Sequence, residues 1–324
     1  MRKHSFDQKK SVLQLIMLFC LLSLLSLTAQ ISSAAEDVVL TKAERHWMIE
    51  HPQVFLGGGP DWAPFDFVNT SGEYSGIAND YLTLIAQKTG LNFVLSIDTW
   101  SHNLNKIKTG KIDVLGAAYY TEDRNQFVNF SSSYIDVLDY FFIRDDLSIT
   151  TLNELSGKRV AVPEKYAHGE VLKKHFPEIK IITVSTFSEA IDAVLENRAD
   201  MLFDAYPAIA YALKKEGINT IIPFKSTRKL GVNPIHIITR KGEPELSSII
   251  QKGLDAITEK ERQIIYSRWL GATPKARNKL VILTTEEQAW LNKTPLVSVG
   301  GSPDWTPFNF TNKKGEYSGI ANDY

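Results

Sequence analysis

One stretch of the chain occurs twice, and it limits the possible folds more than any other feature. Residues 57–81 read GGGPDWAPFDFVNTSGEYSGIANDY, and residues 300–324 read GGSPDWTPFNFTNKKGEYSGIANDY. From Thr41 and Thr284 onward, 24 of 41 positions are identical without a gap, at a constant offset of 243 residues. This period is far longer than the roughly 20–50 residues of solenoid and propeller repeats. The repeating unit is therefore a whole domain, and we expect residues 284–324 to begin a second, truncated copy.

The first 35 residues have the pattern of an export signal. Two pairs of basic residues precede an apolar run at about 12–27, and small and polar residues ending at Ala35 follow it. A charged start, an apolar centre and a small-residue cleavage site are the three parts of a secretory signal peptide. We therefore expect an exported protein, with cleavage near Ala35. An uncleaved membrane anchor is the alternative, because the run is slightly long for the apolar centre of a signal, although it is short for a full span.

Composition excludes several kinds of function. The chain is 44% hydrophobic and 23% charged with a net charge of −1, so it is globular and has no basic footprint for nucleic acid. Its single cysteine, Cys20, lies in the signal segment, which leaves the exported part without thiol chemistry. The phosphate-binding GxxxxGK[ST], nucleophile-elbow GxSxG and metal-binding HExxH motifs are absent. The sequence therefore predicts neither a metal nor a cofactor, and it disfavours an enzyme.

Strand and helix patterns alternate along residues 53–240. Apolar residues recur at helical spacing from Ala78 to Ile85 and again from Trp100 to Ile107, and short apolar strands lie between such stripes. An amphipathic helical region at 244–269 follows. This alternation predicts an α/β fold with mainly parallel sheets. Adjacent acids such as Asp145 and Asp146 are interpreted as solvated side chains.

Several motifs together resemble the family 3 periplasmic solute-binding proteins, whose domains are known as Venus flytraps. They are PDWAPFDF (60–67), GEYSGIANDYL (72–82), KTGKIDVLGAAYYTEDR (108–124), VNFSSSY (128–134), LSGKRVAV (155–162) and ENRADMLFD (196–204). Each motif is loose alone, but their order and spacing are specific. The resemblance covers about residues 53–272 and implies a two-lobed, periplasmic-binding-protein-like (type II) fold. Each lobe is then a mainly parallel sheet flanked by helices, and a two-strand hinge joins them.

The resemblance also implies domain boundaries. A signal peptide at 1–35 precedes a solute-binding domain at 41–272, and a linker at 273–283 leads to the truncated second copy at 284–324. Within the first domain, lobe 1 takes about 53–140 and 236–272. Lobe 2 takes about 145–234.

In lobe 1, the resemblance assigns ligand contacts to residues of two motifs. Arg124 matches the carboxylate-binding arginine, and its planar fork suits a carboxylate. The alternative for Arg124 is a surface ion pair with Glu122 or another acid. Trp62 matches an aromatic residue that lies over the ligand, and its alternative role is a plug of the lobe core. The remaining expected contacts in this lobe are Asp61, Ala117, Tyr119 and Thr121.

Lobe 2 departs from the family pattern. Amino-acid binders carry Gly-Ser/Thr-Thr after the strand that 159–162 resembles, whereas this chain has Pro-Glu-Lys-Tyr-Ala-His at 163–168, with Tyr166 as the expected ligand contact. Relatives place an acid or amide for the ligand's amino group where this chain has Ala205, and Asp204 lies one position early. One residue along a strand exchanges faces, so Asp204 either meets the amino group or points away from the cleft. A plain α-amino acid ligand is correspondingly doubtful.

The resemblance implies reversible binding of a small polar, amino-acid-like or carboxylate-bearing solute, read out by lobe closure. Tandem exported flytraps resemble the input modules of Bvg-type sensor histidine kinases. The resemblance therefore implies that this chain is the N-terminal, ligand-sensing part of a membrane sensor kinase, in the periplasm of a Gram-negative-type envelope, with a membrane-embedded signalling partner. A binding protein for an ABC-type amino-acid uptake system is the alternative, with a transport partner in the membrane. An enzyme on this fold, such as a peptidoglycan lyase or a dehydratase, is the third hypothesis.

Overall fold

The computed structural model describes residues 38–227 and 231–271, together with positions 290, 293, 300–305, 308–312, 315, 317 and 318. The chain forms two compact units, Met1–Ala272 and Thr273–Tyr324. The expected signal peptide and the expected linker lie outside the described residues.

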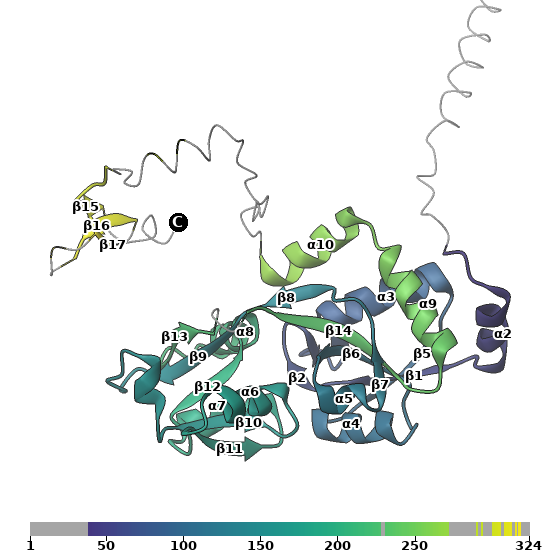
Figure 1. Ribbon diagram of the computed structural model, residues 1–324, viewed down its shortest axis with the longest axis horizontal. Helices are drawn as coiled ribbons and strands as arrows, with labels where there is room; N and C mark the ends of the chain where they lie inside the picture. Colours follow the sequence, from purple (N-terminus) through teal and green to yellow (C-terminus); the bar gives the residue numbers. More distant parts are fainter. Residues whose placement is uncertain are drawn as a thin grey trace, which may run out of the picture. The chain divides into compact units, whose positions relative to one another are not determined.

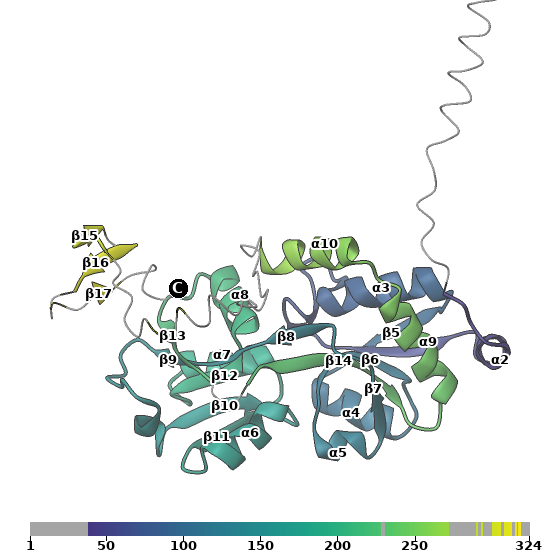
Figure 2. The ribbon, with the colours of Figure 1, turned by 45° about the horizontal axis from the view of Figure 1, so that its top comes forward.

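The first lobe is built on a sheet with the order β5-β1-β6-β14-β7, in which β8 also pairs with β14. Figures 1 and 2 show α3 and α9 on one side of this sheet and α4 on the other. Buried side chains of α3 and α9 pack on β1 and β6 in one cluster, while Leu104 and Ile107 of α4 pack beneath in another. The elements are β1 (Val54–Gly58), β2 (Asp61–Trp62), β3 (Asp66–Val68), β4 (Tyr74–Ser75), α3 (Ile77–Thr89), β5 (Phe93–Ile97), α4 (Trp100–Lys108), β6 (Val114–Tyr119), α5 (Glu122–Asn125), β7 (Val128–Phe130), β8 (Ile135–Val137), β14 (Asn233–Arg240), α9 (Pro244–Asp255) and α10 (Glu259–Leu270).

The second lobe repeats the plan with the sheet order β11-β10-β12-β9-β13. Leu172 of α6 packs with Phe141, Val160 and Phe203 of this sheet. The elements are β9 (Asp139–Arg144), η1 (Leu152–Leu155), β10 (Arg159–Pro163), α6 (Ala167–His175), β11 (Lys180–Val184), α7 (Phe187–Leu195), β12 (Met201–Ala205), α8 (Tyr206–Glu216) and β13 (Ile221–Ser226).

Both sheets are mixed rather than mainly parallel. β1 pairs parallel with β5 and β6, and β10 pairs parallel with β11 and β12. β14 and β9 join these parallel triplets antiparallel. The reason is the path of the chain, which crosses between lobes from β8 to β9 and from β13 to β14. The strands that follow the two crossings, β9 and β14, are the ones that pair antiparallel with β12 and β6.

Two details differ from the sequence-based expectation. The helical region at 244–269 is two helices, because Thr258 caps a new helix by a reciprocal capping box with Glu261. Strand β9 begins at Asp139 and belongs wholly to the second sheet, while β14 begins in the first sheet at Asn233.

Gly76 shows why the repeated GEYSG sequence needs its last glycine. It precedes α3 with φ +119, a backbone conformation that side chains rarely adopt. A Cβ there would lie 2.5 Å from the backbone oxygen of Phe65. The glycine therefore allows the β2–β4 segment to lie directly on the start of α3.

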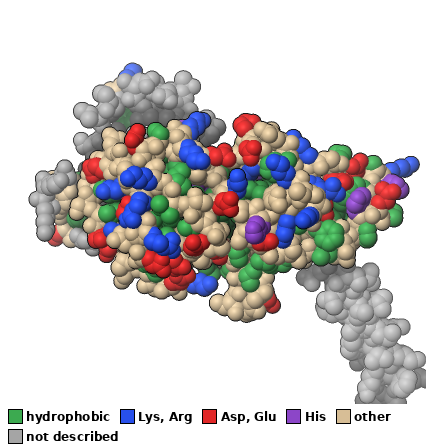
Figure 3. Space-filling view, turned by 90° about the horizontal axis from the view of Figure 1, so that it is seen from below, with side chains coloured by type: hydrophobic (Ala, Val, Ile, Leu, Met, Phe, Trp, Pro, Cys, Tyr) green, Lys and Arg blue, Asp and Glu red, His purple; other side chains and the backbone are tan. Residues whose placement is uncertain are grey.

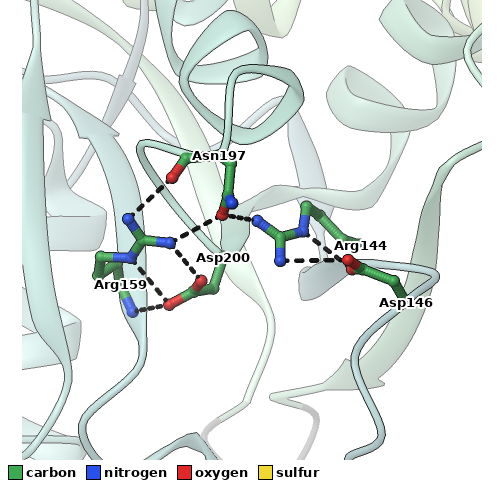
Figure 4. Close-up of polar contacts among 5 residues, drawn as sticks. All are labelled: Arg144, Asp146, Arg159, Asn197 and Asp200. Atoms are coloured by element: carbon green, nitrogen blue, oxygen red, sulfur yellow. Dashed lines mark hydrogen bonds and ion pairs between the residues drawn. The ribbon is translucent and has the colours of Figure 1, made fainter.

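A polar network holds one edge of the second lobe (Figure 4). Arg159 donates to both oxygens of Asp200, from Nη2 at 2.7 Å and from its backbone N–H at 2.8 Å. Asn197, in the left-handed conformation with φ +59, accepts from Arg159 Nη2 at 3.0 Å and from Arg144. Arg144 also donates to Asp146 at 2.9 Å. These acids pair with arginines, so Asp146 has a structural partner rather than a role in a cleft.

Helix α2 (Lys42–Glu50) precedes the first sheet and lies against α9. Thr41 caps it in a capping box with Glu44. The Glu44 carboxylate pairs with Lys252 at 2.7 Å, and Trp47 Nε1 donates to Glu243 at 2.5 Å. Burial opposes ionisation of Glu44, but hydrogen bonds from Lys252 and the cap outweigh it and lower its pKa to about 2.

The described part of the second unit contains the strands β15 (Asp304–Trp305), β16 (Asn309–Thr311) and β17 (Tyr317–Ser318). Their pairing repeats that of β2, β3 and β4 at the offset of 243 residues: Trp305 opposes Asn309 as Trp62 opposes Asp66. Thr311 likewise opposes Tyr317 as Val68 opposes Tyr74. The duplicated sequence therefore forms the same local structure twice.

Candidate functional site

A pocket lies between the two lobes of the first unit. It holds about 550 Å³, including the space open to solvent at its mouth. The pocket is lined by Gly59, Pro60, Asp61, Trp62, Asp66, Thr99, Trp100, Ala117, Ala118, Tyr119, Arg124, Tyr166, Ala167, His168, Ser185 and Thr186. These residues come from strand ends and helix starts of both lobes, where open α/β sheets bind ligands.

The β2–β3 turn carries the first wall of the pocket. The Gly59 backbone N–H donates to Asp66 Oδ1 at 2.9 Å, which folds residues 59–66 back on themselves. Burial raises the pKa of Asp66 to about 6. Asp61 Oδ2 accepts the backbone N–H of Ser188 at 2.7 Å, in the first turn of α7. A carboxylate of lobe 1 thus meets a helix N-terminus of lobe 2, which favours negative charge.

Arg124 is the buried cation of the site. It lies on α5, which Thr121 caps by accepting the Arg124 N–H, and its side chain is 4% exposed. The guanidinium donates to the carbonyls of Tyr119 at 2.6 Å and Lys165 at 2.8 Å, and lies 4.9 Å from the centre of the Trp100 ring. Burial lowers its pKa to about 10, which leaves it charged at neutral pH. No carboxylate of the described residues lies within ion-pair distance of it.

The Lys165 carbonyl is the acceptor that joins the lobes at this point. Lys165 has φ +63, a left-handed conformation that is uncommon for a side chain other than glycine. Its carbonyl accepts from Arg124 and, at 3.0 Å, from Trp100 Nε1. Lys165 thus holds an uncommon backbone conformation while its carbonyl accepts two hydrogen bonds from the opposite lobe. Such locally unfavourable conformations cluster at functional sites.

One residue of the pocket wall, His168, and two acids behind it form a buried charged cluster. His168 lies between Asp139 and Asp204, with Nε2 at 3.2 Å from Asp139 Oδ2 and Nδ1 at 3.7 Å from Asp204 Oδ2. Both contacts are ion pairs without hydrogen-bond alignment. Burial opposes protonation of His168, but the two carboxylates outweigh it and raise its pKa to about 9. Burial raises the pKa of Asp204 to about 6, so at neutral pH the acid is ionised and the imidazole is protonated.

Aromatic rings form the rest of the wall. Trp62 packs edge-on against Tyr119 and Tyr166 at centroid distances of 6.0 and 6.4 Å. The Trp62 indole donates to Asp204 Oδ1 at 2.9 Å, and the Tyr119 hydroxyl donates to Asp139 Oδ1 at 3.1 Å. Each ring of lobe 1 therefore reaches an acid of lobe 2.

Most of the sequence-predicted contacts meet in this pocket. Asp61, Trp62, Ala117, Tyr119, Arg124 and Tyr166 line it. Thr121 does not line it; it is buried as the cap of α5. Asp204 does not line it either, although its side chain accepts the Trp62 indole N–H of lobe 1. The surface ion pair considered for Arg124 is also wrong, because Glu122 instead accepts from Tyr120.

Sequence reasoning missed Trp100, Lys165, His168 and Asp139. The signal for two of them was present: the segment at 163–168 departs from the family pattern, and Lys165 and His168 lie in it. Asp139 and Trp100 had no such signal, because their partners are distant in the chain.

Comparison with known proteins gives the family. Residues 54–272 match the family model described as bacterial extracellular solute-binding proteins, family 3. The virulence sensor protein BvgS of Bordetella pertussis is 29% identical over 231 residues, which are 71% of this chain and 19% of that protein. The sensor protein EvgS of Escherichia coli O157:H7 is 29% identical over 250 residues, 75% of this chain and 20% of that protein. The chain thus spans about a fifth of the length of these relatives.

Solved structures agree. The periplasmic domain of B. pertussis BvgS superposes with a TM-score of 0.67 at 26% identity, over 80% of this chain and 49% of that chain. Its isolated VFT2 domain superposes with a TM-score of 0.65 at 27% identity, over 71% of this chain and 99% of that chain.

These relatives are sensor and solute-binding domains with a two-lobed α/β fold that binds rather than catalyses. Within the described residues, no helix is both long enough and apolar enough to span a membrane. On the face shown in Figure 3, acidic and basic side chains are interspersed. The chain belongs to the bacterial extracellular solute-binding proteins, family 3.

Proposed function

We propose that the first unit binds a small carboxylate-bearing solute between its lobes, outside the cytoplasm, and that lobe closure reports the binding. The observation that carries this proposal is Arg124, a buried guanidinium that faces the pocket and donates only to neutral carbonyls. A buried charge without an opposite charge is costly, and a ligand carboxylate would compensate it.

The test is a thermal-shift screen of the purified protein against amino acids, polyamines, dicarboxylates and nicotinate-like acids. A ligand that binds only the folded state raises the melting temperature. We expect carboxylates to give the largest shifts. A screen in which no compound shifts the wild-type protein would contradict the binding proposal.

Arg124→Ala should abolish the shift given by the best carboxylate. Loss of charge-assisted hydrogen bonds costs about 1.5–3 kcal/mol, or at least about tenfold in affinity. Without ligand, the melting temperature should change little, because the variant also loses an unpaired buried charge. Arg198→Ala is the matched control, since Arg198 is an exposed arginine that pairs with Glu196. An Arg124→Ala protein that fails to fold would assign this residue to structure.

We further propose that this domain is the ligand-sensing input of a membrane sensor kinase in a Gram-negative-type periplasm, exported by a signal cleaved near Ala35. The similarity to BvgS and EvgS and the recurrence of the β2–β4 pairing in β15–β17 support this proposal. Continuation of the coding sequence past codon 324 into a membrane helix and a kinase domain would be the expected result. N-terminal sequencing of the exported protein checks the cleavage site.

A second candidate is the binding protein of an ABC-type amino-acid uptake system. The arginine-binding periplasmic protein of Mannheimia haemolytica matches at 23% identity over 65% of this chain and 89% of its own length, so a single-flytrap protein aligns almost completely. A stop codon directly after a second flytrap would favour this candidate over the sensor.

A further inference from the structure

We propose that His168 is a specificity-determining residue that fills a cation subsite with a side chain of the protein itself, so that the cleft selects carboxylates without an ammonium group over α-amino acids. This inference rests on the proposed binding of a carboxylate solute in the same pocket.

The cation subsite is formed by two acids of lobe 2. Asp139 and Asp204 are 1% and 2% exposed, and the ring of His168, itself 2% exposed, lies between them. Two buried carboxylates that face one position need a cation there, since a buried charge without a partner is costly. In this protein the imidazole occupies that position.

Three of the four carboxylate oxygens of the two acids already accept hydrogen bonds from other groups. Asp139 accepts from the Tyr119 hydroxyl at 3.1 Å and from Asn233 Nδ2 at 2.6 Å. Asp204 Oδ1 accepts from Trp62 Nε1 at 2.9 Å and from the Ala205 N–H at 2.7 Å. Only Asp204 Oδ2 makes no hydrogen bond within the described residues, and the charged group facing it is His168. While the ring is in place, Asp204 Oδ2 is thus the one oxygen of these two acids without a hydrogen bond to offer to the three donors of an ammonium group.

Access leads to the same conclusion. His168, Trp62 and Tyr119 line the pocket, whereas Asp139 and Asp204 do not. A ligand therefore meets the cation and the rings rather than the acids behind them. The other acids at the pocket, Asp61 and Asp66, each accept a backbone N–H from Ser188 and Gly59. Together with Arg124, the wall presents two cationic side chains, which suits an anion without a positive charge of its own.

The experiment compares matched pairs of probes by isothermal titration at pH 7: propionate with L-alanine, 3-phenylpropionate with L-phenylalanine, and glutarate with L-glutamate. Members of each pair differ by one ammonium group. For wild-type protein, we expect the deamino acid of the best-binding pair to bind at least about tenfold more tightly than the amino acid. Equal or tighter binding of the amino acid would overturn the inference and would place the ammonium at another acid, such as Asp61 or Asp66.

Two variants of His168 distinguish the effect of filling the position between the acids from the effect of the positive charge of the imidazole. His168→Ala opens the position between the acids, so the amino acid should gain at least about tenfold relative to its deamino partner. His168→Gln keeps the bulk of the side chain without the charge, so the ratio should stay within about threefold of wild type. Equal gains in both variants would show that the ring does not act by filling the subsite. If His168→Ala does not fold because its two acids are left without a cation, the inference is still tested by the ratio of amino-acid to deamino-acid affinity in the wild-type protein and in His168→Gln.

The proposed carboxylate site and the proposed role of His168 would be contradicted by different results. If no member of any pair binds wild-type protein, and Arg124→Ala behaves as wild type in the wider screen, the carboxylate site itself is wrong and the inference falls with it. If carboxylates bind through Arg124 but the ammonium makes no difference, only the role of His168 is wrong.

Discussion

The protonation of His168 depends on the groups that face it. Asp139 and Asp204 attract its proton and Arg124 repels it, and the rings of Tyr119 and Tyr166 pack beside the imidazole. Both tyrosines have pKa values raised well above 10, so they stay neutral across the pH range in which the histidine titrates. The imidazole is thus the group that changes charge in the cluster above neutral pH.

This arrangement predicts a loss of stability in alkali. The pKa of His168 is about 9 in the folded protein and roughly 6.5 in the unfolded chain. The folded state therefore binds the proton more tightly, so the contribution is complete below pH 6.5 and disappears as the pH rises through 9. The free energy of unfolding of wild-type protein, relative to His168→Gln, should fall by ~2–3 kcal/mol between pH 6.5 and 9.5. Urea unfolding at half-unit pH steps measures it. A difference that stays constant across this range would show that His168 is neutral in the folded protein.

Among the elements, the turn between α7 and β12 offers a separate test of backbone and side-chain effects. Asn197 combines a left-handed backbone with an amide oxygen that accepts from two arginines. Asn197→Ala loses the acceptor and strains the backbone, so it should lower the free energy of unfolding by about 2 kcal/mol. Asn197→Gly loses only the acceptor and should cost about 1 kcal/mol less than Asn197→Ala.

Urea unfolding of the two variants gives this comparison, and Arg198→Ala, at the neighbouring exposed position, serves as the control. If the alanine variant matched the glycine variant, the positive φ would carry no cost in this turn.

Helices and strands whose determining contacts are close in the sequence were predicted better than those whose contacts join distant parts of the chain. Helices α3 and α4 were predicted because apolar periods are local. The break between α9 and α10 was missed, although Thr258 and Glu261 form a capping box, because apolar spacing continues across it. The mixed pairing of β9 and β14 could not be predicted from periodicity, since strand direction depends on the path between lobes.

The candidate site shows the same limit. Arg124 and Trp62 could be predicted because each lies in a recognisable motif. The cluster behind them joins residues that are far apart in the chain: Asp139 and Asn233 are separated by 94 positions, and Arg124 and Lys165 by 41. Short-range patterns carry no information on such pairs.

At the scale of the whole first unit, a few polar contacts hold the lobes together around the pocket. Asp61 accepts from Ser188, Trp62 donates to Asp204, and Trp100 donates to the carbonyl of Lys165. All three cross the cleft, so the lobes are in contact in this conformation. Each contact biases a closed-to-open equilibrium of the two lobes.

Asp61→Ala should shift that equilibrium toward open lobes. Loss of one hydrogen bond to a partly exposed carboxylate costs about 1 kcal/mol, which is roughly fivefold in the ratio of closed to open. The buried Ala205 amide donates to Asp204, whose other hydrogen bond comes from Trp62 across the cleft, so it should then exchange about fivefold faster, as measured by hydrogen exchange and mass spectrometry.

Asp304→Ala is the control for this change, because Asp304 is the counterpart of Asp61 at the offset of 243 residues and pairs with Ser302. Equal exchange at Ala205 in both variants would mean that Asp61 does not restrain the lobes.

The paired strands of the duplicated segment also have a consequence for how the protein folds. The paired residues of β2, β3 and β4 are at most 8 positions apart, whereas the Trp62–Asp204 bond spans 142. Local pairs form in about 1–10 μs, and contacts with distant partners wait for the loop entropy to be overcome. Trp62 is thus held in its turn early in folding, but the cleft it faces assembles late. During synthesis, this side of the pocket can therefore close only after Asp204, the distant partner of Trp62, has left the ribosome.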